Sequence, residues 1–120
     1  MSEPQILHIQ PELALAIIGG RWKMPILWRL ALKPVWRYGE LKRDLGLISH
    51  KMLSQQLKEL AESGLVERKL YPVVPPRVEY SLTNKGRLAL PAIRALCHFY
   101  SDFMEHEGKQ SPTCVEPDLR

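Results

Sequence analysis

The segment 49–63 carries hydrogen-bonding and cationic side chains at a spacing that gathers them on one face of a helix. Leu53, Leu57 and Leu60 define an apolar stripe, because residues three and four apart share a helix face. The opposite face presents five polar residues, His50, Lys51, Ser54, Gln55 and Lys58. Amide, hydroxyl and cationic groups of these kinds pair with base edges and phosphates. A solvated surface explains the same pattern, so this face by itself leaves both interpretations open.

Arg37 and Tyr38 stand at the predicted start of a neighbouring helix over residues 38–45. Backbone N–H groups at a helix start bind phosphate oxygens, and a cation beside them strengthens that attraction. Ser49 has the corresponding place before the longer segment, where its hydroxyl is a good N-cap. We therefore predict that Arg37, Tyr38 and Ser49 contact DNA together with the five polar residues.

A further cation, Arg77, follows the proline-rich stretch 72–76 between two segments with β-strand composition. Prolines stiffen the connection, and a rigid loop loses little conformational entropy when it binds. Arg77 in such a wing suits the minor groove or the DNA backbone. Alternatively, Arg77 pairs with Glu79 or Glu67 of the hairpin itself.

The charge distribution favours a polyanionic partner for the middle of the chain. The whole chain of 120 residues has a formal net charge of only +4. Residues 20–87 contain 14 Lys/Arg and 6 Asp/Glu, a net charge of +8, and the remainder has a net charge of −4. A basic segment that coincides with the polar helix face is the pattern expected of a nucleic-acid binder.

These side chains need a scaffold, and the apolar periodicity with its Gly, Pro and cap signals predicts one. The predicted helices cover residues 12–18, 22–32, 38–45, 49–63 and 84–107, and the predicted strands cover 65–71 and 77–82. Pro91 should kink the last helix or shift its start. A helix, a short turn, a second helix and a hairpin form a winged helix-turn-helix, an α+β fold that is mainly α.

Composition excludes several other classes of protein. No apolar run approaches the ~20 residues of a membrane span, and the first residues lack the pattern of a secretory signal. Two cysteines make no disulfide framework, so we expect a cytoplasmic protein without a membrane partner. No catalytic or phosphate-binding motif is present, and we expect no enzyme activity and no cofactor.

Three other features have a plain structural explanation. His98, Asp102 and His106 are spaced for a metal on one helix face, but solvated or interface positions explain them, and we predict no metal. Cys97 falls on the apolar stripe of the last helix as a packed hydrophobe, whereas Cys114 lies in a tail where it could oxidise incidentally. The three tryptophans suit core and dimer packing, or else a pocket for a small planar effector.

The chain resembles the HxlR-type winged-helix transcriptional regulators over roughly residues 11–107. The resemblance is carried by the segments Ile18–Lys23, Ile26–Leu27, Arg37–Leu41, Ile48–Leu60, Gly64–Arg68, Tyr71–Pro72, Val74–Thr83 and Gly86. It implies a homodimer that binds an inverted repeat in double-stranded DNA, with the first and last helices forming the dimer interface. A winged helix that binds a protein partner without DNA is the competing interpretation.

The chain departs from this family at one place. Several members sense thiol-reactive compounds through a cysteine shortly before the first helix, but this chain has Ile9-Gln10-Pro11 there. The resemblance therefore predicts no thiol sensing by that route. We divide the chain into an arm (1–10), a winged-helix domain with its dimerisation helices (11–107) and a flexible tail (108–120), with the recognition helix at 49–63 and the wing at 71–78.

Overall fold

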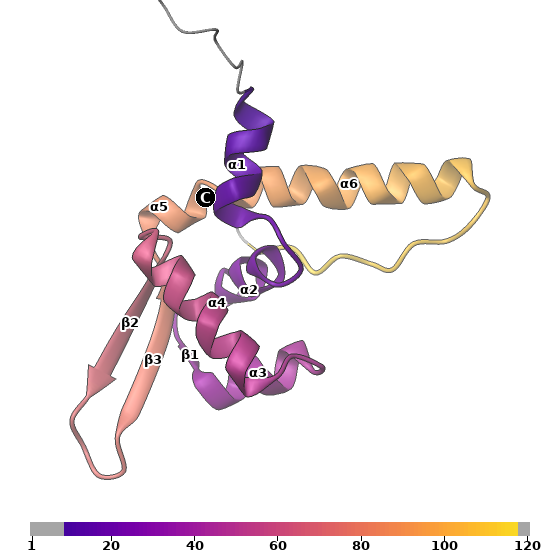
Figure 1. The fold of residues 1–120 in the computed structure, drawn as a ribbon. Coiled ribbons are helices and arrows are strands. Elements are labelled where there is room, and N and C mark those ends of the chain that lie inside the picture. The colour runs from indigo at the N-terminus through magenta and orange to yellow at the C-terminus, as the bar shows by residue number, and fades with distance from the viewer. Residues whose placement is uncertain (1–8, 118–120) are drawn as a thin grey trace, which may run out of the picture.

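A computed structural model describes residues 9–117 of the protein (Figure 1). The elements follow the order α1 (Gln10–Ile18), α2 (Lys23–Leu30), β1 (Trp36–Arg37), α3 (Tyr38–Leu45), α4 (His50–Glu62), β2 (Val66–Tyr71), β3 (Arg77–Leu82), α5 (Asn84–Arg87) and α6 (Leu90–His106). The predicted winged helix-turn-helix is confirmed: α3 and α4 form the helical pair, and β2 and β3 form the wing.

The core forms where apolar faces of α2, α3 and α4 meet the sheet and the start of α6. Ile26, Leu27 and Leu30 of α2 are buried, and so are Leu41 of α3 and Ile48 in the turn that follows. The predicted stripe of α4 is buried as well, since Leu53, Leu57 and Leu60 are each at most 2% exposed. Burial of this stripe fixes the rotation of α4 about its own axis and turns the opposite face outward.

Local signals in the sequence set both ends of the helical pair. The carboxylate of Glu40 accepts a hydrogen bond from the backbone N–H of Arg37 at 2.8 Å, which caps the start of α3. Gly46 ends α3 with a positive φ of 77°, a conformation that glycine adopts without strain. Ser49 then caps α4, because its Oγ accepts a hydrogen bond from the N–H of Met52 at 3.0 Å.

The sheet has a third strand that the sequence did not predict. The strand order is β1-β3-β2, and both pairs are antiparallel, with Trp36 of β1 opposite Tyr80 of β3. A strand of two residues is too short to show an alternating pattern, so only the pairing with β3 defines it. This strand buries Trp36 directly before α3 and so anchors the start of the helical pair.

The predicted helix over 84–107 is two helices. Thr83 caps α5 through a hydrogen bond from the N–H of Gly86 to its Oγ at 2.9 Å, and α5 ends at Arg87. Pro91 lies in the first turn of α6, where its missing N–H costs no helical hydrogen bond. The sequence allowed for a shifted start at this proline, and the structure shows that alternative rather than a kink.

The C-terminal part of the described chain leaves the winged helix along α6 and then returns to it (Figure 1). In Figure 1, α6 extends away from the rest of the fold, and residues 109–117, which the sequence assigned to a flexible tail, run back beside it. Residues 1–8 of the predicted arm lie outside the described residues. The first helix, α1, begins at Gln10, two residues before its predicted start. Within residues 9–117, no helix is long and apolar enough to cross a bilayer.

A substitution at Gly86 tests how closely α5 packs against the turn before β2. A Cβ at Gly86 would lie 2.1 Å from the backbone oxygen of Leu65, so we expect Gly86→Ala to lower the free energy of unfolding by about 1–3 kcal/mol. Gly39→Ala is the control, because in α3 its Cβ meets only the end of the Arg43 side chain at 3.6 Å. That substitution should stabilise by up to about 1 kcal/mol. Urea unfolding measures both, and equal stabilities would contradict the packing described for Gly86.

Candidate nucleic-acid interface

The predicted binding residues of α4 share one solvent-facing surface. Ser49 and the five polar residues of the helix face are all exposed, while the leucines behind them are buried. Within residues 9–117, neither Lys51 nor Lys58 has an acidic partner, so both ammonium groups are available to an anion. The surface therefore combines hydrogen-bonding groups with uncompensated positive charge.

Tyr38 connects α3 to this surface. Its hydroxyl lies 3.1 Å from Nδ1 of His50, 3.2 Å from the carbonyl oxygen of His50 and 3.3 Å from Oγ of Ser54. The Tyr38 and His50 rings also stack, with centroids 5.8 Å apart and planes 12° from parallel. Three of the predicted residues from two helices thus form one cluster, which holds the start of α4 against α3. The sequence named all three residues but not their contacts, because Tyr38 and Ser54 are 16 positions apart.

Gln55 is held by a network that reaches α2. Its amide donates a hydrogen bond to Oε2 of Glu59 at 2.7 Å, and the Nζ of Lys23 forms an ion pair with Oε1 of the same carboxylate. Lys23 also donates to Oε1 of Gln56 at 3.0 Å. The bond to Glu59 uses one of the two amide protons of Gln55, so the second amide proton remains for a base.

The Lys23–Glu59 contact also sets the charge of the carboxylate. The hydrogen bond from Lys23 holds the pKa of Glu59 below its ordinary value of 4.5, and the bond from Gln55 acts in the same direction. Glu59 is therefore an anion at neutral pH, and its charge is balanced by Lys23 rather than left on the surface. This pairing removes an acidic group from the edge of the basic face.

Arg37 points its guanidinium away from the core at the start of α3. Its backbone N–H is occupied by Glu40, and this bond is the largest cause that lowers the pKa of the Glu40 carboxyl. Lys33 pairs with the other oxygen of Glu40 at 3.0 Å, so the carboxylate is already balanced. The exposed side chain of Arg37 forms no ion pair with an acid among residues 9–117, although its charge helps to lower the pKa of Glu40.

The wing presents its cations in a different way. Arg77 Nε lies 3.3 Å from Oε2 of Glu79, and the guanidinium covers the ring of Tyr71 at 4.5 Å from the centroid. The pairing with Glu79 is thus present in the unbound chain, and DNA contact by Arg77 stays a prediction. Arg68 and Lys69 on the outer strand β2 are exposed, and they are wing cations that the sequence did not single out. The strand order β1-β3-β2 makes β2 an edge strand, and this position alone indicates that Arg68 and Lys69 are cations of the wing.

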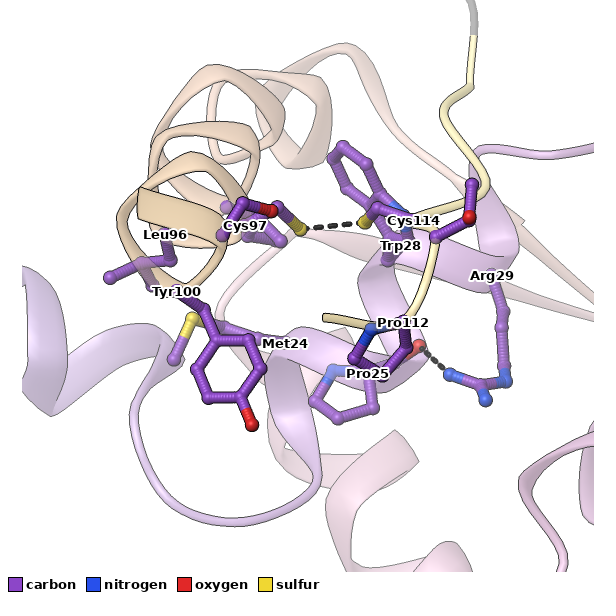
Figure 2. Close-up of a pocket in the computed structure, with 12 residues that line it drawn as sticks. Met24, Pro25, Trp28, Arg29, Leu96, Cys97, Tyr100, Pro112 and Cys114 are labelled. Carbon is purple, nitrogen blue, oxygen red and sulfur yellow. Dashed lines mark hydrogen bonds between the residues drawn. The ribbon is translucent and has the colours of Figure 1, made fainter. Parts of the chain in front are cut away.

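An apolar cavity lies on the other side of α2, away from this surface. Figure 2 shows it between α2, α6 and the segment 112–114, with Trp28 and Tyr100 among its walls, and its volume is about 420 Å³. Trp28 and Trp36 are buried and Trp22 packs against the core, in agreement with the packing explanation for the tryptophans. His98 faces Glu116 at 3.6 Å, and among residues 9–117 no group of three His, Cys, Asp or Glu could hold a metal.

Comparison with known proteins points to one family. The model of the HxlR-like helix-turn-helix family matches residues 17–108. An HTH-type transcriptional regulator of Halalkalibacterium halodurans is 54% identical over 85 residues, which are 71% of this chain and 75% of that protein. The HTH-type transcriptional regulator YdzF of Bacillus subtilis is 50% identical over 86 residues, 72% of this chain and 79% of its own length. The solved structure of the redox regulator HypR in its oxidised form superposes with a TM-score of 0.70 at 36% identity, covering 76% of this chain and 93% of that one.

The lowered pKa of Glu59 gives a test of the α2–α4 network. Because the folded-state pKa lies below 4.5, the pair stabilises the fold at neutral pH, and this contribution is lost as the pH falls from 4.5 through the lowered value. We expect Lys23→Met to raise the Glu59 pKa toward 4.5, measured by carboxyl NMR titration. Lys58→Met is the control, since Lys58 adjoins Glu59 in the sequence without contacting it, and an equal rise there would contradict the assignment.

Proposed function

The chain belongs to the HxlR-like helix-turn-helix family of transcriptional regulators, and on this basis we propose that it regulates transcription as a homodimer on an inverted repeat in double-stranded DNA. The single observation that carries the proposal is the outward polar and basic face of α4, which stands second in the helix-turn-helix. In this fold the second helix of the pair enters the major groove. We propose that it acts in the cytoplasm, where a regulator of this kind meets DNA.

We assign the base contacts to α4 and the positioning contacts to its surroundings. Gln55 offers an amide to adenine, and Lys51 and Lys58 offer cations to guanine or phosphate. Tyr38 and Ser49 adjoin the N-terminus of α4, where the backbone attracts a phosphate. Arg37 at the start of α3 supplies a second phosphate contact. The cluster around the Tyr38 hydroxyl supports this division, because it fixes the two helix starts relative to each other before DNA arrives.

We assign the wing to the minor groove or the backbone beside the half-site. Arg77 is half-buried and its Nε is paired with Glu79 at 3.3 Å, so it reaches phosphate either with its remaining guanidinium nitrogens or by exchanging Glu79 for phosphate. Arg68 and Lys69 on β2 form no ion pair with an acid among residues 9–117, so these two cations can bind phosphate directly. The wing then contributes affinity for any sequence, and α4 contributes the preference for one.

The dimer follows from the apolar surfaces that the single chain leaves open. On α6, Phe99 and Phe103 are 65% and 50% exposed with their rings 6.1 Å apart, and on α1 Leu15 is 56% exposed. An apolar cavity of about 460 Å³ separates α1 from α5 and α6. A second copy that packs against these helices would cover the apolar area and relate two α4 helices by a two-fold axis. The half-sites should then lie about 10 bp apart or at a multiple of that spacing.

The small-molecule effector stays a prediction. The cavity of about 420 Å³ between α2, α6 and the segment 112–114 is one place that suits a small apolar molecule. A ligand there would contact α6, a helix of the proposed dimer interface, and could change the spacing of the two recognition helices. A shift in operator affinity on adding candidate ligands tests this prediction.

Two substitutions separate base contacts from backbone contacts. We expect Gln55→Ala to weaken binding to a selected operator by about 1–3 kcal/mol and to leave binding to random duplexes nearly unchanged, since one base contact is lost. We expect Arg77→Ala to weaken binding to every duplex and to reduce the slope of log K against log salt by about 0.9. Operators selected from a random pool, followed by titrations at several salt concentrations, measure both effects.

Glu62→Ala is the matched control, because Glu62 lies at the far end of α4 and is exposed without a described partner among residues 9–117. If Gln55→Ala weakened binding to the operator and to random DNA equally, the assignment of a base contact to Gln55 would be wrong. Weak binding to all duplexes with a flat salt dependence would favour the competing role as a protein-interaction module.

The dimer interface can be tested without disturbing the core. We expect the double substitution Phe99→Glu and Phe103→Glu to weaken dimerisation by on the order of 100-fold or more, because each charge replaces an aromatic ring in the proposed interface. Sedimentation equilibrium measures the change, and circular dichroism checks the fold. Leu47→Glu is the control, since Leu47 is 90% exposed but lies in the turn before α4. A double variant as dimeric as the wild type would contradict the assignment.

A further inference from the structure

Two sulfur atoms meet where the C-terminal segment passes α6. Cys97 lies one turn after Ile93 on the inner side of α6, and its Sγ is 2.7 Å from the Sγ of Cys114 (Figure 2). These are the two cysteines of the chain, and both are free thiols in this structure. The sequence placed Cys114 in a flexible tail and treated the two residues separately, so their meeting is a result of the tertiary structure.

The contact is part of an ordered antiparallel pairing. Ser111 Oγ lies 3.3 Å from Ser101 Oγ, and beyond the cysteines Glu116 forms an ion pair with Arg94 at 3.3 Å. The α6 residues in these contacts, at positions 94, 97 and 101, follow one helix face. The positions in the segment rise as those in the helix fall, so contacts on both sides of Cys114 hold it opposite Cys97.

A hydrogen bond to α2 fixes the same segment from the other side. The indole Nε1 of Trp28 donates to the backbone oxygen of Val115 at 2.6 Å, next to Cys114. Trp28 itself is buried, so this donor is held in place by the core. The segment therefore lies between a fixed donor on α2 and a row of partners on α6, and these contacts hold the two sulfurs next to each other.

The surroundings of the two thiols are mostly apolar. Both line the cavity of about 420 Å³, together with Met24, Pro25 and Leu96. Burial raises the pKa of Cys97 to about 11, and the hydrogen bond with Cys114 adds to the rise. Cys97 is therefore protonated at neutral pH, and we assign it the second step, in which it resolves the oxidised Cys114.

We propose that Cys97 and Cys114 form a redox modification site, which a hydroperoxide converts into a reversible intrachain disulfide that fastens residues 109–117 to α6. The site differs from the N-terminal cysteine that the family resemblance implies and this chain lacks. It does not depend on the proposed function, because the pairing involves neither α4 nor the wing. The consequence is structural: the wall of the cavity formed by the segment 112–114 becomes covalently attached to α6.

The chemistry balances with the peroxide as the two-electron oxidant. The Cys114 sulfur attacks one peroxide oxygen, the O–O bond breaks, and the leaving oxygen takes the thiol proton of Cys114 to become water or an alcohol. Cys97 then attacks the sulfenic sulfur of Cys114, the S–O bond breaks, and the hydroxide leaves as water with the proton of Cys97. Two thiols are oxidised by two electrons in total, and a thiol reductant reverses the bond by exchange.

Peroxide oxidation followed by peptide mapping tests the proposal on the full chain. Trypsin cleaves after Arg94 and Lys109, so Cys97 and Cys114 fall on the separate peptides 95–109 and 110–120. After one equivalent of hydrogen peroxide and blocking of free thiols, we expect these peptides to be linked. The chain should run at monomer mass on a non-reducing gel, and dithiothreitol should restore both thiols. Two thiols still free, a link between chains, or over-oxidation of Cys114 with Cys97 free would overturn the proposal.

Matched variants separate the ordered pairing from chance encounters of a loose segment. Cys97→Ser should let a sulfenic acid accumulate on Cys114, detectable with dimedone, whereas Cys114→Ser should leave Cys97 unmodified. If serine at the half-buried position 97 prevents folding, Cys114→Ser still gives the second result on the outer segment. Trp28→Phe keeps both thiols but removes the bond to Val115, and we expect the disulfide to form about fivefold more slowly. Formation at the wild-type rate in a folded Trp28→Phe chain would overturn the role of the ordered segment.

Discussion

Burial of Leu53, Leu57 and Leu60 is the constraint on which the arrangement of the site depends. These side chains are almost completely withdrawn from water, so the apolar area that stabilises the fold also fixes the rotation of α4. A rotation by one residue position would expose part of the stripe and bury polar groups without partners, which costs free energy twice. The core behind α4 therefore turns the polar face of this helix toward solvent, and the interface needs no separate contact to orient it.

The interface is also prepared by contacts among its own residues. Tyr38 contacts His50 and Ser54 across the two helices, and Glu59 binds both Gln55 and Lys23. Such contacts reduce the number of side-chain conformations that must be lost on binding. They also set a condition, because the carboxylates of Glu59 and Glu79 compete with DNA for Gln55 and Arg77. Lys51 and Lys58 supply charge that no acid among residues 9–117 pairs with.

The C-terminal third of the chain connects two surfaces that serve different purposes. One side of α6 carries Leu90, Ile93 and Cys97 against α2 and the returning segment, and another side carries Phe99 and Phe103 into solvent. A helix with two apolar sides needs two partners, and residues 9–117 of the chain supply one of them. The proposed dimer covers the second side, and residues 109–117 cover part of the first. A covalent bond in that segment would thus act directly beside the dimer helix.

Much of this protein is determined by the sequence alone. The leucine spacing, the N-cap at Ser49 and the Gly and Pro signals are local, and they predicted the helical pair, the wing and the exposed face of α4 within a few residues. The tertiary structure decided what depends on residues far apart in the chain: the pairing of β1 with β3, the separation of α5 from α6, the ion pair of Lys23 with Glu59 across 36 positions, and the meeting of Cys97 with Cys114. Local signals come from neighbours within about one helical turn, whereas these contacts depend on how whole elements pack, which no single segment encodes.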